Sequence, residues 1–225
     1  MNVAMLFSAL GVAIVLWFLM VRQLRTKPWI EKGTIDIDQG TAGLPAERVG
    51  LWVFLGVVTS LFSLFMIMYA ERAEFPDWRP LPDPQLLWIN TAFLILGSLA
   101  FQLARNATRH DTLSGVKRNL TAGGIFTIVF IAGQLLVWRQ LTSSGYYFPS
   151  NPANTFFYLV TGLHALHLLG GLWVWARTTL RVWRGLSNLD MAEIGRIRLS
   201  VQLCSVYWHF LLLLWLVLFY FLITT

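Results

Sequence analysis

Six long stretches without Asp, Glu, Lys or Arg constrain the fold of this chain more than any other feature. Each has about 18 residues or more, the length that a helix needs to cross roughly 30 Å of hydrocarbon. Of the 225 residues, 56% are hydrophobic and 12% are charged, a balance typical of membrane proteins and unlike that of a soluble helical protein. We therefore expect an all-α, polytopic membrane bundle of six transmembrane helices. The stretches are Val3–Val21, Val49–Tyr69, Leu86–Ala104, Leu120–Trp138, Thr155–Ala176 and Leu199–Thr225.

The first stretch differs from a cleaved signal peptide in the position of its charges. A signal peptide carries positive charge before its apolar run, whereas here Arg22 and Arg25 follow the run and no basic residue precedes it. We expect a retained leading transmembrane helix at residues 1–22. A cytoplasmic connector with several Pro and Gly residues would follow at 23–48, and a five-helix core at 49–225.

Basic residues are distributed unevenly between alternate loops. Fourteen of the 17 Lys and Arg residues lie in the loops after the first, third and fifth stretches. Such loops are cytoplasmic by the positive-inside rule, which places both termini on the outer, periplasmic side. The net charge of +6 then reflects membrane topology, and no nucleic-acid partner is expected. The fourteen are Arg22, Arg25, Lys27, Lys32, Arg48, Arg105, Arg109, Lys117, Arg118, Arg177, Arg181, Arg184, Arg196 and Arg198.

Three of the four histidines, His164, His167 and His209, lie inside the last two apolar stretches. An ionisable residue inside a membrane span is a functional-site hypothesis by default. A haem or metal site is one interpretation, but no span contains a carboxylate to orient a ligating imidazole. The other interpretation is that each ring bonds to a neighbouring helix or meets lipid headgroups. We expect the second, with no cofactor and no metal bound by this chain.

The spans offer few residues for proton transfer, thiol redox chemistry or catalysis. All eleven acids lie in loops, which disfavours a proton relay, and the single cysteine, Cys204, excludes a redox-active dithiol. No nucleophile–base pair or phosphate-binding loop occurs, so no catalytic residue is expected. The uncharged polar residues of the spans suit hydrogen bonding between helices. They include Thr59, Ser60, Ser63, Asn90, Thr91, Gln102, Thr127, Gln134 and Gln202.

Four segments resemble, in the same order, sequence patterns of subunit III of haem–copper respiratory oxidases. The resemblance runs from Gly50 to the end of the chain, and its last two segments are the specific ones. The segments are Gly50–Leu55 (GLWVFL), Asn90–Thr91 with Gly97–Ser98, Thr161–His167 (TGLHALH) with Gly170, and Tyr207–Phe210 (YWHF) with Trp215.

The resemblance implies a non-catalytic subunit of an oxygen-reducing respiratory oxidase in the electron transport chain. Members of that family bind no haem or copper and pack beside catalytic subunit I and the other oxidase subunits. They also hold phospholipids in a cleft, here expected between the leading helix and the core. The small number of expected helices favours a bacterial inner membrane as the location of this chain. Two alternatives stay open: a standalone membrane haem or metal protein, and an accessory subunit of a nitric oxide reductase system.

Two departures from the family pattern mark a divergent member. The family usually has Ser-Glu where this chain has Val57 and Val58, and Val-Asp where it has Leu211 and Leu212. Both intramembrane acids are therefore replaced by aliphatic residues, and we expect lipid acyl chains to touch Val57 and Val58. Candidate residues for contact with lipid or another subunit are Trp29, Arg48, Trp52, His164, His167, Trp208 and His209.

Overall fold

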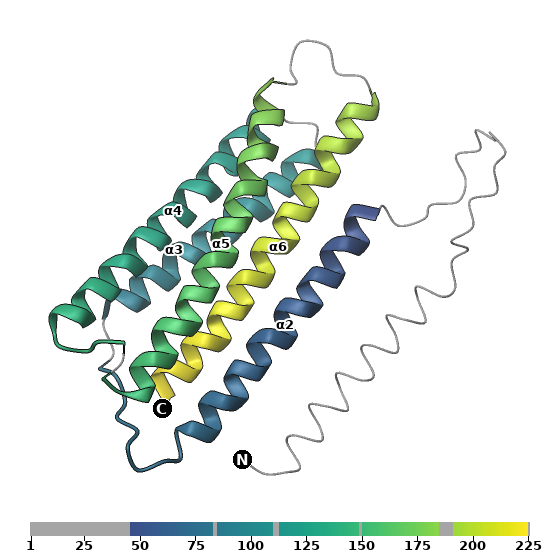
Figure 1. The fold of residues 1–225 in the computed structure, drawn as a ribbon. Helices are drawn as coiled ribbons and strands as arrows, with labels where there is room; N and C mark the ends of the chain where they lie inside the picture. Colours follow the sequence, from purple (N-terminus) through teal and green to yellow (C-terminus); the bar gives the residue numbers. More distant parts are fainter. Residues whose placement is uncertain (1–45, 83–84, 110–112, 149, 185–190, 225) are drawn as a thin grey trace, which may run out of the picture. The chain divides into compact units, whose positions relative to one another are not determined.

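The computed structural model describes residues 46–82, 85–109, 113–148, 150–184 and 191–224 (Figure 1). Its five helices are all long and apolar enough to cross a membrane, which confirms the all-helical class and the five spans expected from Val49 onward. The sixth expected span, Val3–Val21, lies outside the described residues together with most of the connector, so the division at residues 22 and 48 stays a prediction. The helices are α2 (Ala46–Arg72), α3 (Gln85–Arg109), α4 (Leu113–Ser143), α5 (Pro152–Arg184) and α6 (Met191–Thr224).

The helices extend beyond the uncharged stretches that predicted them. The stretch ending at Ala104 continues as helix to Arg109, and the stretch ending at Ala176 continues to Arg184. Backbone hydrogen bonding does not stop where the side chains become polar, and a cation near a helix C-terminus interacts favourably with the helix dipole. The apolar stretches therefore mark the part of each helix that hydrocarbon can surround, and the charged ends reach beyond it.

A loop contact shows that α2 ends at the same end of the bundle at which α5 begins. The Asn151 side-chain amide donates to the carbonyl oxygen of Arg79 at 2.8 Å, which ties the loop after α2 to the loop before α5. Within the first of these loops, Arg72 Nη1 donates to Asp77 Oδ1 at 2.7 Å, and Nη2 donates to Oδ2. These bonds lower the pKa of the Asp77 carboxyl. The contact between the two loops agrees with the course of the chain, in which successive helices run in alternating directions (Figure 1).

Helices α3, α4, α5 and α6 pack around a common core, and α2 is attached differently. Close backbone approaches join α3 to α4, α4 to α5, α5 to α6, and α6 to α3. Among the five described helices, α2 alone has no such approach and meets its neighbours through side chains. The cluster that attaches it contains Val58, Phe62 and Met66 of α2, Val160 of α5, and Leu214 and Leu218 of α6.

Aromatic side chains form hydrogen bonds between helices of the group α3, α4, α5 and α6, which we call the four-helix group. The indole nitrogen of Trp175 on α5 donates to the carbonyl oxygen of Leu120 on α4 at 2.8 Å. The indole nitrogen of Trp215 on α6 donates to Thr91 Oγ1 on α3 at 3.0 Å. Because helix association in lipid gains little from the hydrophobic effect, such bonds and close packing hold the helices together.

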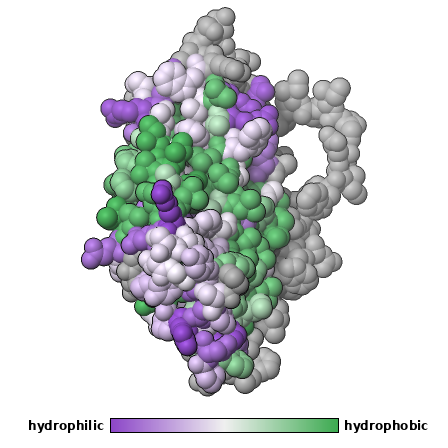
Figure 2. All heavy atoms as spheres, turned by 60° about the vertical axis from the view of Figure 1, so that its left-hand side comes forward, coloured by the Kyte–Doolittle hydropathy of each residue, from purple (hydrophilic) through white to green (hydrophobic). Residues whose placement is uncertain are grey.

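The outward-facing side chains are mostly apolar. On the face visible in Figure 2, hydrophobic residues occupy the central region, and hydrophilic residues lie mainly toward its ends. Among the exposed residues are Trp52, Leu64 and Met68 of α2, Leu99 of α3 and Trp173 of α5. A soluble protein rarely exposes so many large hydrophobic side chains together, whereas a lipid-facing surface requires them.

Candidate functional site

His209 connects α6 to α3 through side-chain hydrogen bonds. Its Nδ1 contacts Ser98 Oγ, and its Nε2 lies 2.9 Å from Gln102 Oε1, both on α3. The acceptor Oε1 requires that Nε2 carries a hydrogen. In the neutral ring, Nδ1 then accepts from the Ser98 hydroxyl. One imidazole thus bonds to two positions that lie four residues apart on the neighbouring helix.

His167 faces α2, although it lies only three residues from His164. Its Nδ1 lies 2.7 Å from the carbonyl oxygen of Leu163 on its own helix. Its ring centroid lies 5.5 Å from that of Phe62 and 6.2 Å from that of Phe54, both on α2. The backbone carbonyl of His167 also accepts a hydrogen bond from the Tyr207 hydroxyl at 2.8 Å, so this position joins α2, α5 and α6.

His164 lies in the interior of the four-helix group. Its side chain has no exposed surface, and its ring lies between Trp215 of α6, 5.2 Å away by centroid, and Phe130 of α4, 6.2 Å away. Neither ring nitrogen has a hydrogen-bond partner within the described part of the chain. Of the three rings, only that of His209 makes the expected hydrogen bond to a neighbouring helix. The His167 ring bonds within its own helix, and the His164 ring has no partner among the described residues.

The three histidines do not converge on a common point. His164 faces the core, His167 faces α2, and His209 faces α3. Within the described ranges, no group of three or more His, Cys, Asp or Glu side chains could hold a metal ion. All three rings pack against other helices or lie in the core, and the His209 ring also bonds to α3.

The remaining contact candidates occupy different environments. Trp52 is 57% exposed on α2, and Arg48 is half-buried near the start of that helix. Trp208 is buried and stacks on Phe101 of α3 at 4.9 Å between ring centroids. Trp208 and His164 therefore lie inside the described chain and do not reach its surface. Trp29 lies outside the described residues.

The two valines that replace the family's Ser-Glu pair point in different directions. Val57 is 63% exposed, and its contact with acyl chains stays a prediction. Val58 is 2% exposed and belongs to the cluster that attaches α2 to α5 and α6. The expectation that lipid touches Val58 is therefore wrong, because consecutive residues of a helix point about 100° apart and only one of the two can face outward here.

Sequence reasoning did not pair His209 with Ser98 and Gln102. It named two buried amides only among the polar residues suited to bonding between helices and did not select them as site residues. Asn90 and Gln134 are 2% and 3% exposed. The Asn90 amide nitrogen and both amide atoms of Gln134 have no hydrogen-bond partner among the described residues. The available signal was an uncharged polar residue inside an apolar stretch, which indicates interhelical bonding but does not identify a partner.

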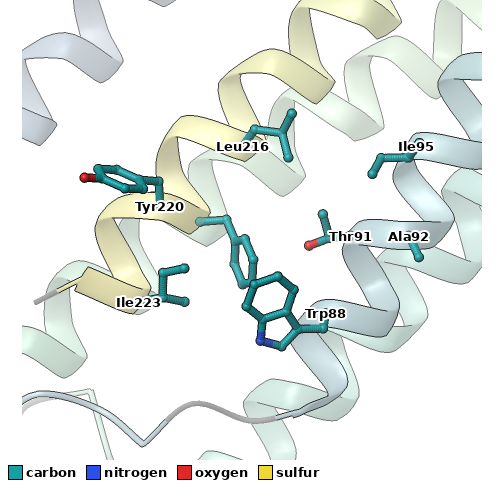
Figure 3. A pocket seen from close by; sticks show the side chains of 8 residues that line it. Trp88, Thr91, Ala92, Ile95, Leu216, Tyr220 and Ile223 are labelled. Carbon is teal, nitrogen blue, oxygen red and sulfur yellow. The ribbon is translucent and has the colours of Figure 1, made fainter.

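An apolar groove of about 440 Å³ lies between α3 and α6 (Figure 3). Trp88 and Phe219 meet edge to face across it, with ring centroids 4.8 Å apart. No charged residue lines the groove, so it suits an apolar occupant. Its lining consists of Trp88, Thr91, Ala92, Ile95, Leu216, Phe219, Tyr220 and Ile223.

Several proteins of known type are similar to this chain over most of its length. A probable cytochrome c oxidase subunit 3 from Mycobacterium tuberculosis is 30% identical over 176 residues, which cover 76% of this chain and 84% of that protein. A cytochrome c oxidase subunit 3 from Thermostichus vulcanus is 30% identical over 200 residues, or 84% of this chain and 95% of that protein. One from Synechocystis is 27% identical over 186 residues, or 80% and 76%. No protein-family model matches the sequence.

Proposed function

The chain belongs to the cytochrome c oxidase subunit 3 family, and from this membership we propose that it is a non-catalytic subunit of a respiratory haem–copper oxidase. The observation that carries the proposal is the 30% identity across 95% of a subunit 3. The lack of convergence among the three intramembrane histidines supports it, since a redox centre needs ligands that meet. Haem and copper belong, in this proposal, to the catalytic partner.

The proposed partners are catalytic subunit I, the other oxidase subunits and phospholipid. Support comes from the outward faces of α2, α3 and α5, which present large apolar side chains such as Trp52, Leu99 and Trp173. On α2, the exposed Val57 offers an apolar side chain to acyl chains. Trp29 and Arg48 are proposed to meet lipid headgroups at the cytoplasmic edge, because Trp and Arg favour that depth.

Purification through an affinity tag on this chain tests the proposal. We expect a haem–copper catalytic subunit to copurify and the complex to reduce oxygen, while the chain purified alone shows no haem absorption and no stoichiometric metal. A metal or haem in the isolated chain that is lost in His164→Ala would favour a standalone metalloprotein instead. Copurification with a subunit that reduces nitric oxide but not oxygen would favour the second candidate function, which the replaced acids at Val58 and Leu212 suggest.

The His209→Leu substitution should loosen assembly without altering the redox centres. The change removes the bonds from His209 to Ser98 and Gln102. The Ser98 hydroxyl is buried, and a buried donor left without its partner costs about 1–3 kcal/mol. We expect less of this subunit per complex after detergent extraction and an unchanged haem spectrum. His209→Gln, which keeps a donor and an acceptor, is the matched control and should lose less. An altered haem spectrum at full subunit content would contradict the proposed structural role.

Both termini are proposed to lie on the periplasmic side, as in a chain that crosses the bacterial inner membrane six times. In a variant whose buried Cys204 is replaced by alanine, single cysteines at Asn2 and Thr224 should react with a membrane-impermeant reagent in intact cells. A cysteine at Gly115, near the start of α4, should react only after the cells are opened. Reaction of the cysteine at position 115 in intact cells would show that the chain has the opposite orientation.

A further inference from the structure

Three buried polar side chains of the four-helix group have hydrogen-bonding atoms without a partner. These are Asn90 of α3, Gln134 of α4 and His164 of α5, none more than 3% exposed. The unpartnered atoms are the Asn90 amide nitrogen, both amide atoms of Gln134 and both ring nitrogens of His164, counted within the described chain. Buried polar atoms in folded proteins are nearly always hydrogen-bonded, to protein or to ordered water. We call these three side chains the inner polar site.

The register of α4 against α5 brings Gln134 and His164 to the same level. The Trp138 indole nitrogen of α4 donates to Thr161 Oγ1 of α5 at 3.2 Å. Gln134 lies four residues before Trp138, and His164 lies three residues after Thr161. Because the two helices run in opposite directions, both steps lead from the Trp138–Thr161 contact toward the same depth, and spacings of three and four stay on one helix face.

Two contacts bring Asn90 of α3 to this level as well. A methyl group placed on Gly133, the residue before Gln134, would lie 2.0 Å from Asn90 Oδ1, so the Asn90 amide lies directly against the backbone beside Gln134. The neighbouring Thr91 accepts the hydrogen bond from Trp215, whose ring lies 5.2 Å from that of His164. The inner polar site therefore draws on three helices at one depth of the core.

We propose that the inner polar site holds ordered water that bridges His164 to Gln134 and Asn90. The site offers donors and acceptors in a neutral set: the Asn90 amide donates, the Gln134 amide does both, and a neutral imidazole provides one of each. Water can donate twice and accept twice, and buried waters usually occupy positions with two to four such partners. A cation fits poorly, because no group of three metal-ligating side chains occurs in the described part of the chain.

The ring environment of His164 separates it from the other histidines and makes the site observable. His209 already bonds to Ser98 and Gln102, and His167 bonds to a carbonyl of its own helix. Since the chain has only four histidines, their imidazole signals can be resolved individually. Ring N–H groups that exchange magnetisation with water therefore report water at a particular histidine.

Proton-detected solid-state NMR of the full chain in lipid bilayers, with ¹⁵N-labelled histidine, tests the proposal. We expect a water cross-peak at the His164 ring, assigned by its loss in His164→Phe. Gln134→Leu should remove most of that cross-peak, whereas Gln102→Leu, which changes the His209 network instead, should leave it intact. The proposal is overturned if the wild-type chain shows no water at His164, if the His164 ring contacts the Gln134 amide directly, or if Gln134→Leu leaves the cross-peak unchanged.

Discussion

Replacing Gly124 by alanine should prevent α4 and α5 from packing and sharply reduce the amount of folded chain in the membrane. A methyl group at this position would lie 2.0 Å from Trp175 Cζ2 and 2.2 Å from Cε2. The indole cannot simply swing aside, because its nitrogen bonds to the Leu120 carbonyl on α4 at 2.8 Å. Overpacking of this kind costs about 1–3 kcal/mol and sometimes more, and losing the indole bond adds about 0.5–1.5 kcal/mol.

The control for this prediction is Gly170→Ala on α5. A methyl group there meets no atom within 4 Å, and alanine favours helix over glycine, so this variant should accumulate like the unsubstituted chain. Gly171→Ala, where the methyl would lie 2.6 Å from Tyr207 Cε1, should fall between the two. The measurements are the chain content of washed membranes and the midpoint of thermal unfolding in detergent. Equal behaviour of Gly124→Ala and Gly170→Ala would contradict the packing described between α4 and α5.

Restoring the family's acid with Val58→Glu should detach α2 and should not speed oxygen reduction. Val58 is 2% exposed in a cluster whose other buried members are all apolar, Phe62 and Leu218 among them. A charged residue at the centre of a membrane helix costs about 2.5–3.5 kcal/mol on insertion scales, and the longer side chain must also displace its neighbours. We therefore expect loss of the chain from the complex, with no gain in turnover for the complexes that remain.

Val58→Gln separates the two causes, because glutamine has the size of glutamate without its charge. If charge dominates, the glutamine variant should retain more subunit than the glutamate variant. Oxygen consumption is then compared per assembled complex, for Val58→Glu alone and together with Leu212→Asp, the second position at which the family has an acid. A higher rate, or slower inactivation during turnover, at equal subunit content would show that the acids still have a role in this complex.

The sequence alone determined the helices of the described core, since an uncharged stretch long enough to cross hydrocarbon has few alternatives to a helix. The segments TGLHALH and YWHF, read with the two weaker ones, were also sufficient to predict the family to which the chain belongs. Both conclusions depend on local composition and short-range order along the chain, which are present in the sequence without any knowledge of contacts.

The tertiary structure decided which face of each helix is inside. Lipid tails are as apolar as a protein core, so a membrane helix lacks the contrast between polar and apolar faces that would reveal its orientation. Val57 and Val58 are chemically identical, yet one is exposed and the other is buried. In the same way, His164 and His167 share a short motif, but His164 faces the core and His167 faces α2.

Partners and close contacts were likewise visible only in three dimensions. The pairing of His209 with Ser98 and Gln102 joins residues more than a hundred positions apart, and no local pattern specifies such a pair. Gly124 and Gly170 are both glycines within apolar stretches, but only Gly124 lies under an indole ring. Specificity in this bundle therefore depends on steric fit and a few polar contacts between helices, which arise from the register of whole helices against one another.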